Sequence, residues 1–207
     1  MSSKTKLSIL LLWLFTVSGI LGILSPASNW FLALTPLNLF ISFVVLVIHV
    51  ETINKKTLLA FSIPFFLGFG TEALGVNYGL LFGSYAYGAN LGYKIVGVPF
   101  MICINWIMLT IITADLAKKI SNRLYVRAFL GALFMTLLDA IIEVSAPRFD
   151  FWEFEGAEVP IQNYIAWICI SFVAHLAYQY FEIKTNKRIS MHVLASMFVF
   201  FTIFLFI

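Results

Sequence analysis

Charge is scarce in this sequence. Asp, Glu, Lys and Arg make up only 11% of its 207 residues, whereas about a quarter of the residues are charged in a typical soluble domain. Hydrophobic residues account for 61%, and apolar runs of nearly bilayer-spanning length recur throughout. We therefore expect an all-α polytopic membrane protein in which residues 1–207 form one transmembrane domain. This composition argues against a nucleic-acid partner.

The sequence also has little to bind a metal or to form a disulfide. Its two cysteines, Cys103 and Cys169, lie inside apolar runs, where they are expected to be buried thiols. No group of Cys and His has the spacing of a metal site, so no metal is expected. The final apolar run, 198–207, contains no lysine, which excludes a retinal Schiff base on a last helix.

Seven transmembrane helices are expected from the apolar runs. Lys and Arg collect on one side of them, with eleven of the 13 on that side and only Lys94 and Arg148 on the other. The positive-inside rule then predicts a cytoplasmic N-terminus in a multi-pass protein of the inner (cytoplasmic) membrane. The expected helices are 7–24, 31–49, 57–74, 96–118, 124–145, 160–181 and 190–207.

A weak internal repeat relates residues 71–106 to residues 139–167. In each unit a helix ends in Glu, an aromatic loop follows, the chain re-enters at Val-Pro, and Asn stands near an aromatic residue. Because each unit contains two helices, the two copies are parallel and both loops should lie on the outer face. Chance recurrence of residues favoured at membrane interfaces is the alternative. The related residues are Glu72 and Glu143; Tyr85 and Tyr87 in the first loop and Phe151-Trp152 in the second; Val98-Pro99 and Val159-Pro160; and Asn105-Trp106 and Asn163-Tyr164 with Trp167.

Six polar residues interrupt the apolar runs at a similar depth, in the outer half of the membrane. Ionisable groups are costly there and commonly functional, so their shared depth predicts a single pocket. Alternatively, each group pairs locally and holds helices together. His175 could shuttle protons, although a packing role is favoured. The six residues are Asn38, Glu72, Asn105, Asp139, Glu143 and Asn163.

Two stretches resemble the membrane-bound carotenoid hydratase family, the CruF-type enzymes that include archaeal bisanhydrobacterioruberin hydratases. They read TEALGVNYGLLFGSYAYGANLGYKIVGVPFMICINW and LLDAIIEVSAPRFDFWEFEGAEVPIQNYIAW. The second departs from the family pattern at Glu158, where a glycine is expected before Val-Pro. The resemblance implies addition of water to the terminal C1=C2 bond of an acyclic carotenoid end group, giving a tertiary alcohol. It implies no cofactor, and partners limited to a carotenoid (lycopene, gamma-carotene or a related one) and membrane lipid.

The residues allow this chemistry. Asp139, the deepest carboxyl, is expected to protonate the alkene, because an acid held in an apolar site can stay protonated at neutral pH. Glu72 or Glu143 would then handle the water, although Glu72 could be the proton donor instead. Aromatic faces would stabilise the carbocation. The expected substrate-binding residues are Asn38, Asn77, Tyr78, Asn105, Trp106, Trp152, Asn163 and Trp167.

A transporter or proton-coupled carrier is the competing interpretation, because parallel repeats and intramembrane acids also suit carriers. Against it, every intramembrane acid except Asp115 is expected in the outer half, with no polar path to the inner face. A structural or assembly subunit is a third possibility, but no pattern in the sequence supports it.

Overall fold

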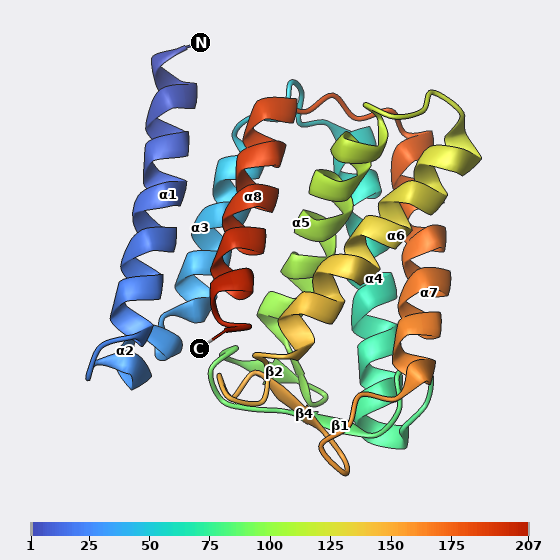
Figure 1. Cartoon of the computed structure of the whole chain (residues 1–207). Coiled ribbons are helices and arrows are strands. Elements are labelled where there is room, and N and C mark those ends of the chain that lie inside the picture. Colours follow the sequence, from blue (N-terminus) through green and yellow to red (C-terminus); the bar gives the residue numbers. More distant parts are fainter. Residues whose placement is uncertain (1, 207) are drawn as a thin grey trace.

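Helices make up most of the structure, a computed structural model that describes residues 2–206 (Figure 1). The expected all-α polytopic class is confirmed, with four very short strands added. Within the described residues, five helices (α1, α4, α5, α6 and α7) are long and apolar enough to cross a membrane. The helices are α1 Ser3–Ile23, α2 Ser28–Ala33, α3 Thr35–Val47, α4 Lys55–Tyr78, α5 Phe100–Ala117, α6 Leu124–Glu143, α7 Ile161–Tyr180 and α8 Lys187–Ile203; the strands are β1 Tyr85–Tyr87, β2 Lys94–Ile95, β3 Val98–Pro99 and β4 Trp152–Phe154.

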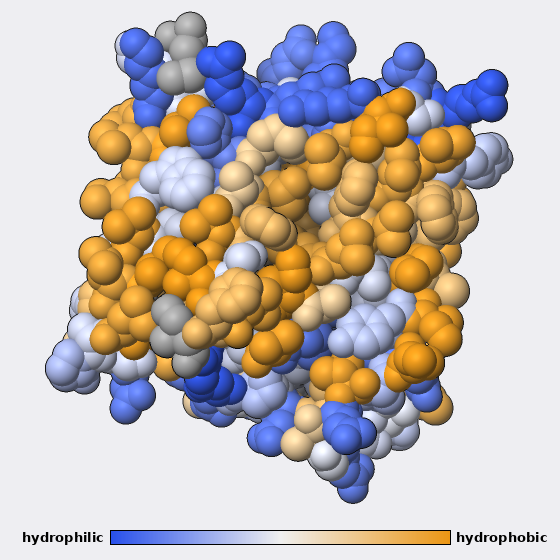
Figure 2. All heavy atoms as spheres, viewed as in Figure 1, coloured by the Kyte–Doolittle hydropathy of each residue, from blue (hydrophilic) through white to orange (hydrophobic). Residues whose placement is uncertain are grey.

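Helix α5 is the centre of the bundle. It packs against α3, α4, α6, α7 and α8, and nearly all of its side chains are buried. Helix α1 stands at the edge and packs mainly against α8 and α2. On the face seen in Figure 2, apolar residues cover the middle of the bundle and hydrophilic residues lie at both ends, as expected for a protein that spans a bilayer.

The expected helix 31–49 is instead two helices, α2 and α3, which meet at Leu34. Pro36 has no N–H to donate to the carbonyl of Leu32, and it stands in the first turn of α3, where proline is well tolerated. The hydroxyl of Thr35 donates to that carbonyl oxygen at 2.7 Å. The chain can therefore turn between α2 and α3 without leaving the carbonyl unpaired.

The two aromatic loops lie on one end of the bundle, which we call the loop face. Strand β1 of the first loop pairs antiparallel with β4 of the second, so that Tyr85 lies opposite Phe154 and Tyr87 opposite Trp152. Strands β2 and β3 form a hairpin whose turn, Val96-Gly97, has positive φ at both residues. The prediction that both loops share a face is confirmed. The opposite end, which carries Lys55, Lys118 and Lys187, is the basic face (Figures 1 and 2).

The direction in which this bundle crosses the membrane can be tested by cysteine labelling. Ser84 and Glu155 are exposed on the loop face, and Lys55 is exposed on the basic face. If the basic face is cytoplasmic, S84C and E155C should react with an impermeant maleimide in intact cells. K55C, the matched control, should react only after the membrane is opened. Cys103 and Cys169 are replaced by Ala beforehand, and the reverse labelling pattern would invert the topology.

Candidate functional site

A small cavity lies at the loop-face end of the bundle, between helices α4, α5, α6 and α7 and beneath the β1–β4 pair. Its volume is about 30 Å³, enough for about two water molecules. Glu72, Asp139 and Glu143 all reach it. The cavity is lined by Glu72, Phe82, Tyr85, Tyr87, Ile102, Asn105, Trp106, Asp139, Ile142, Glu143, Trp152, Phe154, Asn163 and Trp167.

Glu72, on α4, is held by three hydrogen-bond donors. The hydroxyl of Tyr85 donates to its Oε2, and that of Tyr87 donates to the same oxygen at 2.7 Å. Trp106 Nε1 donates to Oε1 at 3.0 Å. Burial, followed by the nearby charge of Glu72, raises the pKa of Tyr85 and Tyr87 well above the ordinary value of tyrosine. Both phenols therefore keep their protons and remain donors to the carboxylate.

Glu143, at the end of α6, receives donors from the second repeat. Trp152 Nε1 on β4 donates to Oε2 at 2.7 Å, and Asn163 Nδ2 on α7 donates to Oε1 at 2.9 Å. Each glutamate thus has both carboxyl oxygens occupied, which suits an ionised carboxylate because that group only accepts hydrogen bonds. The two glutamates occupy corresponding places in the two repeats.

Asp139 differs from both glutamates. It is only 3% exposed, and its Oδ2 has no hydrogen-bond partner among residues 2–206. Asn105 Oδ1, on α5, is likewise buried and unpaired in the described chain. Buried polar atoms are rarely left unpaired without a functional or solvent explanation. Asp139 and Asn105 line the same cavity, so the site can bind a small polar molecule between a carboxyl and an amide.

Two indole rings form one wall of the cavity. Trp106 and Trp167 stack with centroids 4.7 Å apart and planes 6° from parallel. Each stands seven residues after the proline of its Val-Pro re-entry, Pro99 or Pro160. The repeat is therefore visible in the geometry, with equivalent tryptophans meeting at the boundary between the two units.

Three of the residues expected at the site lie elsewhere. Asn38 lines a separate cavity between α1, α2, α3 and α8. Asn77 lies in the last turn of α4, where its Nδ2 donates to the carbonyls of Ala73 at 2.8 Å and Val96 at 3.0 Å, and so ties the β2–β3 hairpin to the helix. Tyr78 is 74% exposed. The expected residues that do line the cavity are Glu72, Asn105, Trp106, Asp139, Glu143, Trp152, Asn163 and Trp167.

Sequence reasoning did not assign Tyr85 and Tyr87 to the site, although they supply two of the three donors to Glu72. A usable signal was present in their spacing. Residues two apart point to the same side of a strand, so the Tyr-Ala-Tyr sequence places both hydroxyls on one face. Phe82, Ile102, Ile142 and Phe154 also line the cavity, but apolar residues of this kind carry no signal in so apolar a sequence.

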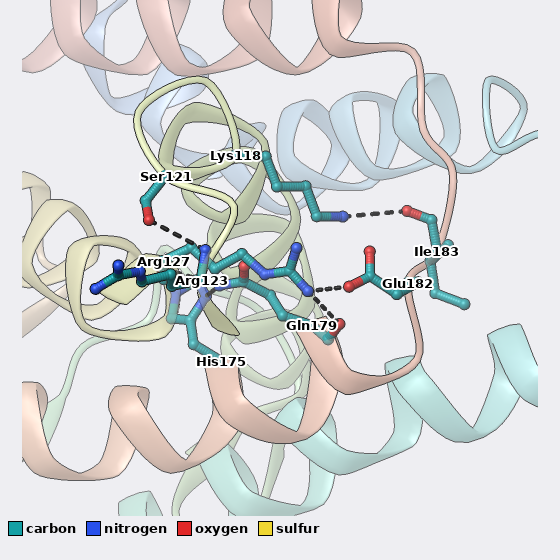
Figure 3. A network of polar contacts seen from close by, with 8 residues as sticks. All are labelled: Lys118, Ser121, Arg123, Arg127, His175, Gln179, Glu182 and Ile183. Carbon is teal, nitrogen blue, oxygen red and sulfur yellow. Dashed lines mark hydrogen bonds and ion pairs between the residues drawn. The ribbon is translucent and has the colours of Figure 1, made fainter. Parts of the chain in front are cut away.

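A second polar cluster, shown in Figure 3, includes Arg127, His175, Gln179 and Glu182, none of which lines the cavity. His175 Nε2 pairs with the hydroxyl of Thr113 at 3.0 Å, and Gln179 Nε2 donates to its Nδ1 at 3.3 Å. Arg127 binds Glu182 and the carbonyl of Gln179. Because both ring nitrogens are occupied and Nδ1 accepts, His175 is held as a neutral imidazole, which fits a packing role.

The chain is similar to proteins of carotenoid metabolism. Residues 34–207 match the model of a family described as carotenoid biosynthesis protein. A bisanhydrobacterioruberin hydratase of Haloarcula japonica is 27% identical over 125 residues, which cover 54% of this chain and 41% of the relative. The match thus spans less than half of that relative's length. No solved structure matches the chain.

The close approach of Trp106 to α4 leads to a prediction for two glycines of that helix, Gly68 and Gly70. A Cβ at Gly68 would lie 2.4 Å from Trp106 Cγ, whereas a Cβ at Gly70 meets nothing within 4 Å. G68A should therefore displace Trp106 from Glu72 and lower the free energy of unfolding by about 1–3 kcal/mol. G70A should be neutral or slightly stabilising. Thermal unfolding in detergent measures both, and equal melting temperatures would show that Trp106 is not confined in this way.

Proposed function

Because this chain belongs to the family of carotenoid biosynthesis proteins, we propose that it is a carotenoid hydratase. It adds water across the terminal C1=C2 double bond of an acyclic carotenoid end group and yields a tertiary alcohol. One observation carries the proposal: three carboxyls line a small cavity in the apolar bundle. Both oxygens of Glu72 and of Glu143 accept hydrogen bonds, whereas Asp139 Oδ2 has no partner within the described residues. Hydration of an alkene requires both an acid and a positioned water, and the printed name of the Haloarcula japonica relative supports the same reaction class.

Asp139 is the proton donor in this proposal. Glu72 and Glu143 take up the surrounding N–H and O–H donors, so they are the carboxyls stabilised as anions. Three negative charges in one apolar cavity would repel one another strongly. The carboxyl that receives fewest donors therefore carries the proton, and Asp139 lines the cavity that would hold the attacking water.

The reaction then balances without any cofactor. The π electrons of the double bond take the Asp139 proton at C2, which leaves a tertiary cation at C1. The oxygen of a water molecule that donates to Asn105 Oδ1 attacks C1, and the proton that it releases passes to a carboxylate of the cavity. Return of this proton to Asp139 restores the starting state, so each turnover consumes one alkene and one water.

The cation is stabilised by groups that surround it. The stacked Trp106 and Trp167 both line the cavity, and the electron-rich face of Trp attracts cations. The anionic Glu72, fixed by Trp106 and the two tyrosines, adds a negative charge that need not reorganise during the reaction. We propose that the apolar carotenoid enters sideways from the lipid while water arrives from the loop face, which faces outward from the cytoplasmic membrane.

The decisive experiment is expression in a lycopene-producing bacterium, followed by chromatography and mass spectrometry of the pigments. The wild-type chain should yield more polar carotenoids, heavier by one water for each hydrated end. D139N keeps the shape of the side chain and removes the acid, and it should lower product about 10²–10⁴-fold at equal amounts of membrane protein.

The matched control for this experiment is E153Q, which removes an exposed carboxyl outside the cavity. It should leave the product unchanged. A D139N variant within a few-fold of wild type would remove Asp139 from the mechanism. Unchanged pigments with the wild-type chain would instead favour the carrier.

Variants of Asn105 and Asn77 can distinguish a side chain that serves the reaction from one that stabilises the fold. The Asn105 side chain makes no hydrogen bond within the described chain, while that of Asn77 makes two. N105A should thus lower product about tenfold, the effect of losing one hydrogen bond to the attacking water, with unchanged thermal stability. N77A should lower stability and leave the product per folded protein unaltered. If N105A simply fails to accumulate in the membrane, its role is structural.

A further inference from the structure

A groove opens between α1 and α8 at the basic face, on the side of the bundle away from the carboxyl cavity. Its volume is about 430 Å³. Trp13 of α1 and Met191 and Ala195 of α8 provide an apolar floor, and Lys119 and Lys187 stand at its rim. The groove thus combines an apolar surface with three cationic side chains, because Arg188 lines it together with the two lysines. The basic face on which it opens is the hydrophilic upper end in Figure 2.

The floor of the groove is held in a defined arrangement. Trp13 Nε1 donates to His192 Nδ1 at 3.0 Å, and the two rings meet edge to face with centroids 6.4 Å apart. A nitrogen that accepts this bond carries no hydrogen, so the hydrogen of the neutral imidazole is on Nε2. His192 therefore keeps an N–H donor among the residues that line the groove.

Neither rim lysine has a side-chain hydrogen bond or ion pair within residues 2–206, and no acidic residue lines the groove. The acids of the basic face are engaged elsewhere. Asp115 accepts hydrogen bonds from Thr185 at 2.5 Å and Ser190 at 2.6 Å. The other two pair with cations outside the groove, Glu182 with Arg127 and Glu51 with Lys184.

We propose that this groove binds an anionic phospholipid. The phosphate group lies between the ammonium groups of Lys119 and Lys187, and an acyl chain runs along Trp13, Met191 and Ala195. Basic clusters beside transmembrane helices attract anionic lipid headgroups, and the groove offers cations without competing carboxylates. Because α1 packs on the bundle mainly through α8, a lipid seated between the two helices would also fix α1 in place.

Native mass spectrometry of the full chain, with phosphatidylglycerol or phosphatidylcholine of identical chains added, tests the proposal. Phosphatidylglycerol should bind at least about tenfold more tightly, because only its headgroup carries a net negative charge. The double variant K119Q/K187Q should weaken phosphatidylglycerol binding about 25-fold, since each lysine near an anionic headgroup contributes a factor of about five. Its binding of phosphatidylcholine should not change.

The matched control is K55Q/K56Q, which removes the same charge from exposed positions of the basic face outside this groove. It should stay within about twofold of wild type for phosphatidylglycerol. Equal losses in the two double variants would mean that the lipid responds only to the general charge of this face, and equal affinity for both lipids would exclude an anion site. If soluble glycerol 3-phosphate displaces the lipid at matched concentration, the groove recognises a free phosphate and the lipid proposal is wrong.

Discussion

A carboxylate buried in an apolar bundle must be given hydrogen-bond donors, because leaving it without partners costs several kcal/mol. Glu72 sits on α4, and all three side chains that donate to it come from elsewhere, Trp106 on α5 and Tyr85 and Tyr87 on β1. The loop after α4 must therefore fold back over its own helix. This requirement fixes the shape of the loop face.

The fold-back is possible because glycine removes the side chains that would block it. A Cβ at Gly75 would lie 2.7 Å from the Tyr85 ring, and one at Gly68 would overlap Trp106. The pairing of β1 with β4 then couples the two repeats, because the ribbon that carries Tyr87 also carries Trp152, which donates to Glu143. Disturbing either loop should therefore affect both glutamates together.

The sequence was enough to predict most of the helices and to predict that Glu72, Asp139 and Glu143 lie at one end of the bundle, because apolar runs and Lys/Arg asymmetry report position along the membrane normal. It was less informative about lateral position. Asn38 was expected in the pocket because of its depth, but α3 places it in a cavity beside α1. Asn77 was expected to bind substrate, yet α4 extends to Tyr78 and uses Asn77 to bind the β2–β3 hairpin. Both placements depend on helix packing and loop conformation, which periodicity does not encode.

The residues between the cavity and the basic face help to decide between the hydratase and the carrier. A carrier must expose its acids to each face in turn, which requires polar groups that can rearrange along the way. Thr110 and Thr113 instead donate to carbonyls of their own helix, and both ring nitrogens of His175 are occupied. Met108, Ile112 and Met135 are fully buried in the helices between. A polar site confined to one end of the bundle suits a hydratase, because its net reaction takes up water, returns the proton to its donor, and moves nothing across the membrane.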